Sequence, residues 1–220
     1  MDIDAGDGID MSNTFKLANR GLFGMCIEGS PVRFAQLSLT YEKFPNVQLV
    51  RKYVSSTSIS HLATSSGLPK NFDVLNLDID SFDYHVLESL LDSSEPKLIV
   101  IEWNRSFPPN LFFTVNNDPT IRWDSQSDLF QGASILAFYE LLSKFNYKII
   151  GVQGSALFAA PVGSSRSYVS LTAEDAWSHY LKGPKKWIHT NLDYLELSKE
   201  DLIKKMDIEM TAFSGKYQLH

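Results

Sequence analysis

The chain has 220 residues and a mass of 24.8 kDa, which is enough for one domain with a sizeable core. Its formal net charge of −6 argues against a nucleic-acid partner, because proteins of that class usually present a basic face. Its one cysteine, Cys26, excludes an internal disulfide framework, and no apolar run has the length of a membrane span. We expect a cytoplasmic protein, monomer or homodimer, that acts without membrane or nucleic acid.

The first eight residues predict a very short strand that runs into a turn containing Gly6 and Gly8. A helix start follows at residues 12–14, and a second strand, Met25–Ile27, ends on Glu28. This succession is typical of the nucleotide-binding half of an α/β fold. Glycines let backbone N–H groups approach a ligand, and an acid one strand over accepts hydrogen bonds from ribose hydroxyls.

The composition of the glycine turn favours one class of nucleoside ligand. The turn lacks the third glycine of a dinucleotide site, and Asp7 and Asp10 bring negative charge to the place of a pyrophosphate. S-adenosylmethionine, which combines a ribose with a cationic sulfonium, suits an acidic turn better. The alternative is an ordinary tight turn and a solvated Glu28.

Strands alternate with helices further along the chain. The strand patterns are Val47–Val54, Phe72–Asp80 and Lys97–Trp103, and the helix patterns are Tyr84–Leu91 and Ile135–Phe145. The polar stretch Ser55–Ser66 is expected to be a loop with one helical turn. Alternation of this kind predicts a parallel sheet with right-handed crossovers.

Two more strands, Tyr147–Val152 and Ala156–Val162, are separated by three residues. So short a connection requires an antiparallel hairpin, because a parallel pair needs a long crossover. The tail beyond Tyr168 carries two helical patterns, Ala173–Leu181 and Ser198–Met206.

In this order and spacing the chain resembles the class I S-adenosylmethionine-dependent methyltransferases, and more narrowly the FkbM-type group. The resemblance covers Met1 to about Val162 and rests on residues 2–8, 12–14, 27–31, 77–80 and 101–104. It implies an α/β Rossmann-like methyltransferase fold: a mostly parallel seven-stranded sheet with a final antiparallel hairpin and helices on both faces. It also implies an O-methyltransferase acting on a hydroxyl of a small molecule, most simply a sugar or glycan.

We expect a methyltransferase domain at residues 1–165, with residues 104–132 as an acceptor-binding lid. Residues 166–220 are expected to be a helical extension that packs on the same domain. Aromatic residues of the lid, such as Phe107 and Phe113, either face the acceptor or anchor the lid to the body.

The resemblance also implies the residues that bind the donor, S-adenosylmethionine. Glu28 takes the ribose, and Asp2 reaches the amino group through water or backbone. The full donor set is Asp2, Asp4, Gly6, Gly8, Asn13, Glu28, Ser56 and Asp78. Asp4 stands at the position of the family's first glycine, where its side chain either crowds the methionine part of the donor or holds its ammonium.

The acids at the strand ends are the expected metal-binding and catalytic residues. Asp78, Glu102 and Asn104 offer hard oxygen ligands for Mg²⁺ or Mn²⁺. Without a metal, Asp80 or His85 is the general base, so the catalytic candidates are Asp78, Asp80 and His85. For each acid, helix capping is the structural alternative. The expected acceptor contacts are Asp80, Trp103, Asn104, Arg105 and Trp123.

One alternative belongs to another functional class. A methyltransferase-like module that binds a nucleoside without turnover keeps the same glycine turn and the same acid. Asp4 at the first glycine position favours that alternative.

Overall fold

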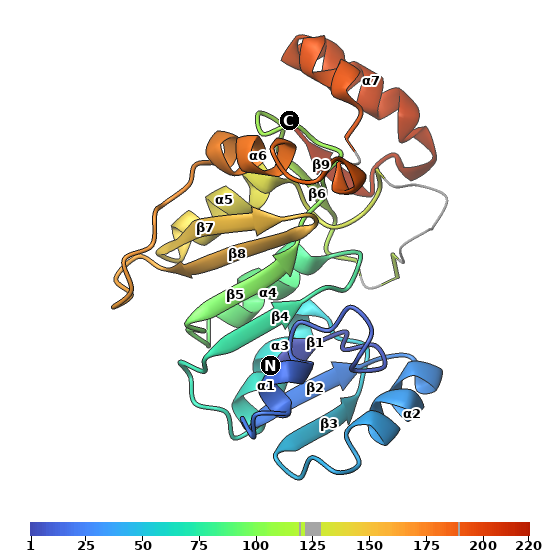
Figure 1. The fold of residues 1–220 in the computed structure, drawn as a ribbon. Helices are drawn as coiled ribbons and strands as arrows, with labels where there is room; N and C mark the ends of the chain where they lie inside the picture. Colours follow the sequence, from blue (N-terminus) through green and yellow to red (C-terminus); the bar gives the residue numbers. More distant parts are fainter. Residues whose placement is uncertain (119, 122–128, 189) are drawn as a thin grey trace. The chain divides into compact units, whose positions relative to one another are not determined.

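The computed structural model describes residues 1–118, 120–121, 129–188 and 190–220 (Figure 1). The chain divides into two compact units. Unit 1 comprises Met1–Ile79 and Val86–Ile99, and unit 2 comprises Asp80–His85 and Val100–His220.

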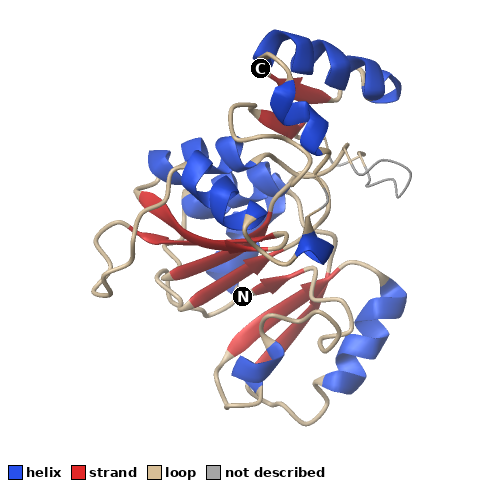
Figure 2. Cartoon of the chain, turned by 45° about the horizontal axis from the view of Figure 1, so that its top comes forward, coloured by secondary structure: helices blue, strands red, loops and turns tan. Residues whose placement is uncertain are grey.

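Within the described residues, seven strands form one sheet in the order β3-β2-β1-β4-β5-β8-β7. Helices lie on both sides of this sheet (Figure 2). The pairs β1–β2, β1–β4 and β2–β3 are parallel, whereas β7–β8 is antiparallel. The expected α/β architecture, a mostly parallel seven-stranded sheet with a final antiparallel hairpin and helices on both faces, is confirmed.

Unit 1 contains the strands of the first half of the sheet. They are β1 (Asp2–Ile3), β2 (Gly24–Glu28), β3 (Val47–Arg51) and β4 (Val74–Leu77), and β5 (Leu98–Glu102) begins in this unit. Ile3 lies between Ile27 and Leu77 in the register of its two neighbours, and all three side chains are fully buried. A strand of two residues is therefore held by apolar contact on both sides.

The helices that begin in unit 1 are α1 (Phe15–Ala18), α2 (Pro31–Thr40) and α3 (Ser56–Ser65). Helix α2 begins where Ser30 Oγ accepts a hydrogen bond from the Arg33 N–H, with Pro31 at the first helical position. Helix α4 (Asp83–Leu91) starts three residues after Asp80, so Asp80 is not its capping residue.

The structure overturns the expected loop at Ser55–Ser66. Helix α3 spans most of it, with Ser55 and Ser58 forming a reciprocal capping box and Ile59 and Ala63 buried one turn apart. The serine-rich composition suggested a loop, but two apolar residues at i and i+4 suffice to bury one helix face.

The second half of the sheet lies in unit 2. Strands β7 (Tyr147–Gln153) and β8 (Ala156–Pro161) form the expected hairpin, with a register shift between Ile149 and Gly151. Helices α5 (Ile135–Lys144) and α6 (Ala173–Leu181) pack against β7 and against each other. These helices agree closely with the sequence predictions.

A second hydrophobic core in unit 2 joins the expected lid to the C-terminal tail. Strand β6 (Phe113–Val115) pairs antiparallel with β9 (Tyr217–Leu219), so the lid segment contains a strand that its sequence did not reveal. Helix α7 (Lys199–Glu209) and three 3₁₀ turns complete this part: Lys185–Trp187, Leu192–Glu196 and Thr211–Phe213.

Aromatic side chains of the lid segment fill this core. Phe107 stacks on Phe113 with centroids 4.1 Å apart, and Phe130 stacks on Phe213 at the same distance. Phe107, Phe113 and Phe130 are buried beside Leu202 and Met206. These aromatic residues anchor the segment, which is the alternative that the sequence left open. In the part of the chain described, no helix is long and apolar enough to cross a membrane.

We expect the second core to be a major source of stability for unit 2. Met206 is fully buried on α7, whereas Ile208 on the same helix is 74% exposed. Met206→Ala should lower the free energy of unfolding by about 2–5 kcal/mol, and the control Ile208→Ala by no more than about 0.5 kcal/mol, in urea titrations. Equal effects of the two substitutions would contradict this packing.

Candidate functional site

The strand order reverses at β1, so this strand is the topological switch point of the sheet. From β1 the chain proceeds through β2 to β3 on one side, and then returns to β4 on the other. Ligands of open α/β sheets bind where the strand order reverses, beyond the carboxyl ends of the strands. The glycine turn follows β1 at this point, and Asp78 directly follows β4. The glycine turn and Asp78 therefore both lie at the switch point in unit 1.

Glu28 holds the glycine turn and the start of α2 together. Its Oε2 accepts a hydrogen bond from the Gly6 N–H at 2.9 Å, and its Oε1 accepts one from the Ser30 N–H at 2.6 Å. The side chain is only 1% exposed. A carboxylate oxygen accepts more than one hydrogen bond, so Glu28 retains lone pairs beyond these two contacts.

The two glycines of the turn serve different purposes. Both have positive φ, 59° at Gly6 and 82° at Gly8. A Cβ on Gly8 would lie 2.5 Å from Tyr41 and 2.8 Å from Leu37, so this glycine lets the turn pack against α2. A Cβ on Gly6 would meet nothing within 4 Å. Gly6 thus faces open space, as a backbone that receives a ligand must.

Asp4 adopts a left-handed conformation with φ of 63°, and Asp80 does the same at 58°. Aspartate tolerates this region better than most residues, yet it remains a strained choice for a side chain. Backbone strain of this kind concentrates at functional sites. Both residues follow strands of the sheet closely, Asp4 after β1 and Asp80 after β4.

Asp2 and Asn13 belong to a buried hydrogen-bond network. Asn76 Nδ2 donates to Asp2 Oδ1 at 2.8 Å, and Thr14 Oγ1 donates to Asp2 Oδ2 at 2.5 Å. Asn13 Nδ2 donates to Asn76 Oδ1 at 2.9 Å. The network joins β1, β4 and the residues before α1, so it fixes both ends of the glycine turn. Burial raises the pKa of the Asp2 carboxyl, against the opposing effect of the hydrogen bonds from Thr14 and Asn76.

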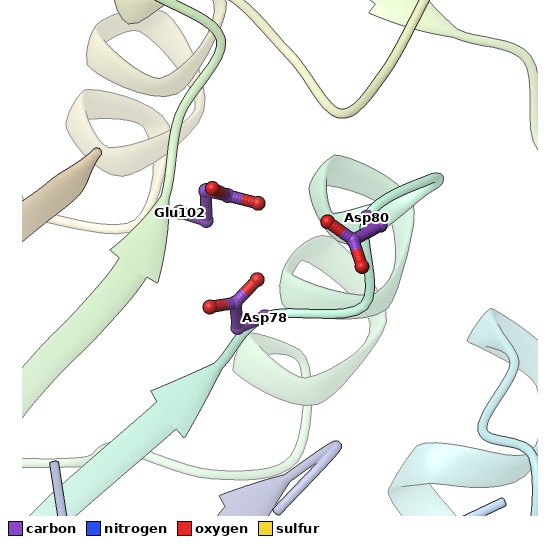
Figure 3. Close-up of side chains that lie close together, drawn as sticks. All are labelled: Asp78, Asp80 and Glu102. Carbon is purple, nitrogen blue, oxygen red and sulfur yellow. The ribbon is translucent and has the colours of Figure 1, made fainter. Parts of the chain in front are cut away.

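Three acids form a cluster at the ends of β4 and β5. Asp78, Asp80 and Glu102 each offer a carboxylate oxygen, and these oxygens lie within 4.8 Å of one another (Figure 3). Asp78 and Asp80 are two residues apart in the chain, and Asp80 and Glu102 both belong to unit 2. Three carboxylates at this spacing are a ligand set suited to Mg²⁺ or Mn²⁺.

Other predicted residues support the lid segment. Asn104 donates from Nδ2 to the carbonyls of Leu129 and Gln131, and its Oδ1 accepts the Ser106 N–H. Its side chain therefore holds the backbone of the lid segment in place. His85 Nε2 contacts the Val115 carbonyl at 3.0 Å, and since a carbonyl only accepts, this nitrogen carries the hydrogen.

Trp103 is 1% exposed, and its ring lies edge-to-face against Trp177 and Tyr180 of α6. It therefore supports the site from inside the protein and presents no face to an acceptor, which corrects the expected contact. The Arg105 carbonyl accepts a hydrogen bond from Thr190 Oγ1. Trp123 lies outside the described residues.

The predicted donor residue Ser56 is the first residue of α3, and its carbonyl accepts a hydrogen bond from Ser89 Oγ at 2.5 Å.

Sequence reasoning missed two residues near Glu28. They are Ser30, whose N–H donates a hydrogen bond to Glu28, and Tyr53, whose ring lies against Gly29. The backbone N–H of Ser30 could not be recognised from the sequence, because every residue except proline has one. Tyr53 could have been, because it is a single aromatic residue just after the end of β3.

Comparison of the sequence with protein-family models and with curated proteins gives no match. Among solved structures, the N-terminal domain of EvdMO1 with SAH bound is 12% identical, covering 72% of this chain and 70% of that one, with a TM-score of 0.41. The selenomethionine-substituted CurJ carbon methyltransferase is 11% identical, covering 74% of this chain and 48% of that one, with a TM-score of 0.43.

A third similar structure is a SAM-dependent methyltransferase from Thiobacillus denitrificans in complex with S-adenosyl-L-homocysteine. It is 16% identical, covers 99% of this chain and 80% of that one, and has a TM-score of 0.38. At these identities the likeness concerns the fold alone.

Burial of Asp2 predicts a pH-dependent stability. Its folded pKa lies above its ordinary value of 3.8, so its stabilising contribution is complete below that pH and is lost as pH rises through the folded pKa. Asp2→Asn, which mimics the protonated acid, should therefore gain stability relative to the wild type between about pH 4 and pH 7, measured by urea unfolding.

Asp7 on the same turn provides a control of opposite sign. Hydrogen bonds from the N–H groups of Ile9 and Asp10 lower the pKa of Asp7, so its contribution is present above pH 3.8 and is lost as pH falls. Asp7→Asn should lose stability relative to the wild type over the same interval. A gain of stability in both variants, or a loss in both, would contradict the opposite pKa shifts of Asp2 and Asp7.

Proposed function

We propose that the protein is an S-adenosylmethionine-dependent O-methyltransferase of the FkbM type that acts on a hydroxyl of a small molecule, a sugar or glycan. The observation that carries this proposal is the hydrogen bond from the Gly6 N–H to Glu28 at the switch point of the sheet. It connects the turn that faces open space to the acid that accepts ribose hydroxyls. A nucleoside is the ligand that uses both features.

The charge of the turn supports a sulfonium donor. Asp4, Asp7 and Asp10 all lie in the eight residues that follow β1, and Asp7 is solvent-exposed enough to stay ionised. A diphosphate ligand would be repelled here, whereas a cationic sulfonium and an ammonium would be attracted. Asp4 directly follows β1, and we assign it to the ammonium of the donor.

Methyl transfer requires little covalent assistance from the protein. The donor is already activated, so catalysis consists mainly of aligning oxygen, methyl carbon and sulfur and of removing the hydroxyl proton. The acids Asp78, Asp80 and Glu102 are the groups available for the proton. Within this set, Asp80 is our candidate for the general base that contacts the acceptor.

The same three carboxylates suit a divalent cation. Their oxygens lie within 4.8 Å of one another, and carboxylate oxygens are the ligands that Mg²⁺ and Mn²⁺ prefer. Asp78, Asp80 and Glu102 would hold the ion. Bound there, Mg²⁺ or Mn²⁺ would lower the pKa of an acceptor hydroxyl.

Donor binding should depend strongly on Glu28. Glu28→Gln keeps the shape of the side chain but replaces one acceptor oxygen with an NH₂ group, so affinity for S-adenosyl-L-homocysteine should fall about 10- to 100-fold in calorimetry. Glu42, an exposed acid of unit 1, provides the control Glu42→Gln with unchanged affinity. Unchanged affinity of a folded Glu28→Gln protein would refute the ribose role.

Metal binding is tested at Asp80. Asparagine also tolerates a positive φ, so Asp80→Asn removes one charge while keeping the backbone at 58°. Affinity for Mn²⁺, followed by electron paramagnetic resonance, should fall by about tenfold or more. The exposed Asp92→Asn provides the control. Absence of Mn²⁺ binding by the wild type would contradict the proposed metal site. Asp80 would then have a role in proton transfer alone.

A binding module without turnover is the second candidate. One observation favours it: the side chain of Asp4 stands, with a positive φ, at a position where the family has glycine. Affinity for S-adenosyl-L-homocysteine together with a lack of methyl transfer to any hydroxyl acceptor screened would favour this candidate.

A further inference from the structure

The ring of Tyr53 occupies the place of a side chain on Gly29. A Cβ built on Gly29 would lie 2.1 Å from Tyr53 Cδ1, 2.4 Å from Cε1 and 2.7 Å from Cγ. These distances are far shorter than any real contact, so the two positions are mutually exclusive. Gly29 has no positive φ that would require glycine. Room for the Tyr53 ring is therefore the structural reason for glycine at this position.

Backbone pairing fixes Tyr53 beside the ribose acid. Strand β3 runs parallel to β2 with Arg51 opposite Glu28, and the Lys52 N–H donates to the Glu28 carbonyl at 3.1 Å. Tyr53 is the next residue, and Gly29 is the residue after Glu28. The two parallel strand ends thus hold the aromatic ring against Gly29, the residue that directly follows the acid we assign to the ribose.

The ring is also open to solvent. Tyr53 is 64% exposed although one part of its ring rests on Gly29. Single exposed aromatic residues are common on protein surfaces and need no function. Tyr53 differs because its ring occupies the place of a side chain on Gly29, the residue that follows Glu28.

We infer that Tyr53 is a stacking wall for the purine ring of the donor. This inference rests on the proposed function and deepens it. A purine is joined to its ribose by one glycosidic bond, so a ribose held by Glu28 carries the purine to the immediate surroundings of Glu28. Flat aromatic rings stack on purines whatever their edge substituents, since every base has a π-face. Gly29 lets the Tyr53 ring stand where it can offer such a face.

Calorimetry with S-adenosyl-L-homocysteine tests the inference. Tyr53→Ala should weaken binding about 5- to 100-fold, the range expected for loss of one base–aromatic stack, and Tyr53→Phe should bind like the wild type. Gly29→Ala should weaken binding as well, because its Cβ displaces the ring. The double variant Gly29→Ala/Tyr53→Ala should be no weaker than Tyr53→Ala, since both changes remove the same contact.

Phe23 is the matched control, since it is an exposed aromatic residue of unit 1, 53% exposed, next to the opposite end of β2. Phe23→Ala should bind with wild-type affinity. Circular dichroism and thermal melting of every variant verify folding.

Two failures are distinguishable in this experiment. A wild-type protein that does not bind S-adenosyl-L-homocysteine overturns the proposed function and the inference with it. A wild-type protein that binds, with a Tyr53→Ala variant that binds equally or more tightly, overturns the stacking wall alone. Additive losses in the double variant would likewise show that Gly29 and Tyr53 act separately.

Discussion

The carboxylate of Glu28 is the interaction on which the candidate site depends. It accepts one N–H from the glycine turn and one from the residue that starts α2, so a single buried side chain holds two segments of unit 1. A buried carboxylate requires such partners, because an unpaired charge in the interior is costly. The same constraint orients Glu28 toward the glycine turn.

Several other residues hold the backbone of the glycine turn in place. Asp2, Asn13 and Asn76 form a network that fixes both ends of the glycine turn. Gly8 has no Cβ, and this allows the turn to pack closely on Leu37 and Tyr41. The turn is thus held from three directions, and Gly6 is left facing open space. A rigid frame around an open backbone segment is what pre-organised binding requires.

Unit 2 uses its aromatic residues for a different purpose. The segment between β5 and α5 is rich in aromatic residues, and it shares a core with α7 and β9. A long segment of this kind needs its own source of apolar burial, because a structureless loop in a compact protein cannot offset its conformational entropy. The C-terminal tail supplies that burial, and Asn104 ties the segment to itself by three hydrogen bonds.

The sequence by itself determined the alternation of strands and helices, the β7–β8 hairpin and the position of Glu28, because periodicity and turn length act over a few residues. Only the tertiary structure decided which predicted residues are taken up by contacts within the protein. Asp2, Asn104 and Trp103 read as site residues from their spacing, yet their partners lie far along the chain, at Asn76, Leu129 and Trp177. The pairing of β6 with β9 and the place of Tyr53 on Gly29 depend on such distant contacts too, which no local pattern encodes.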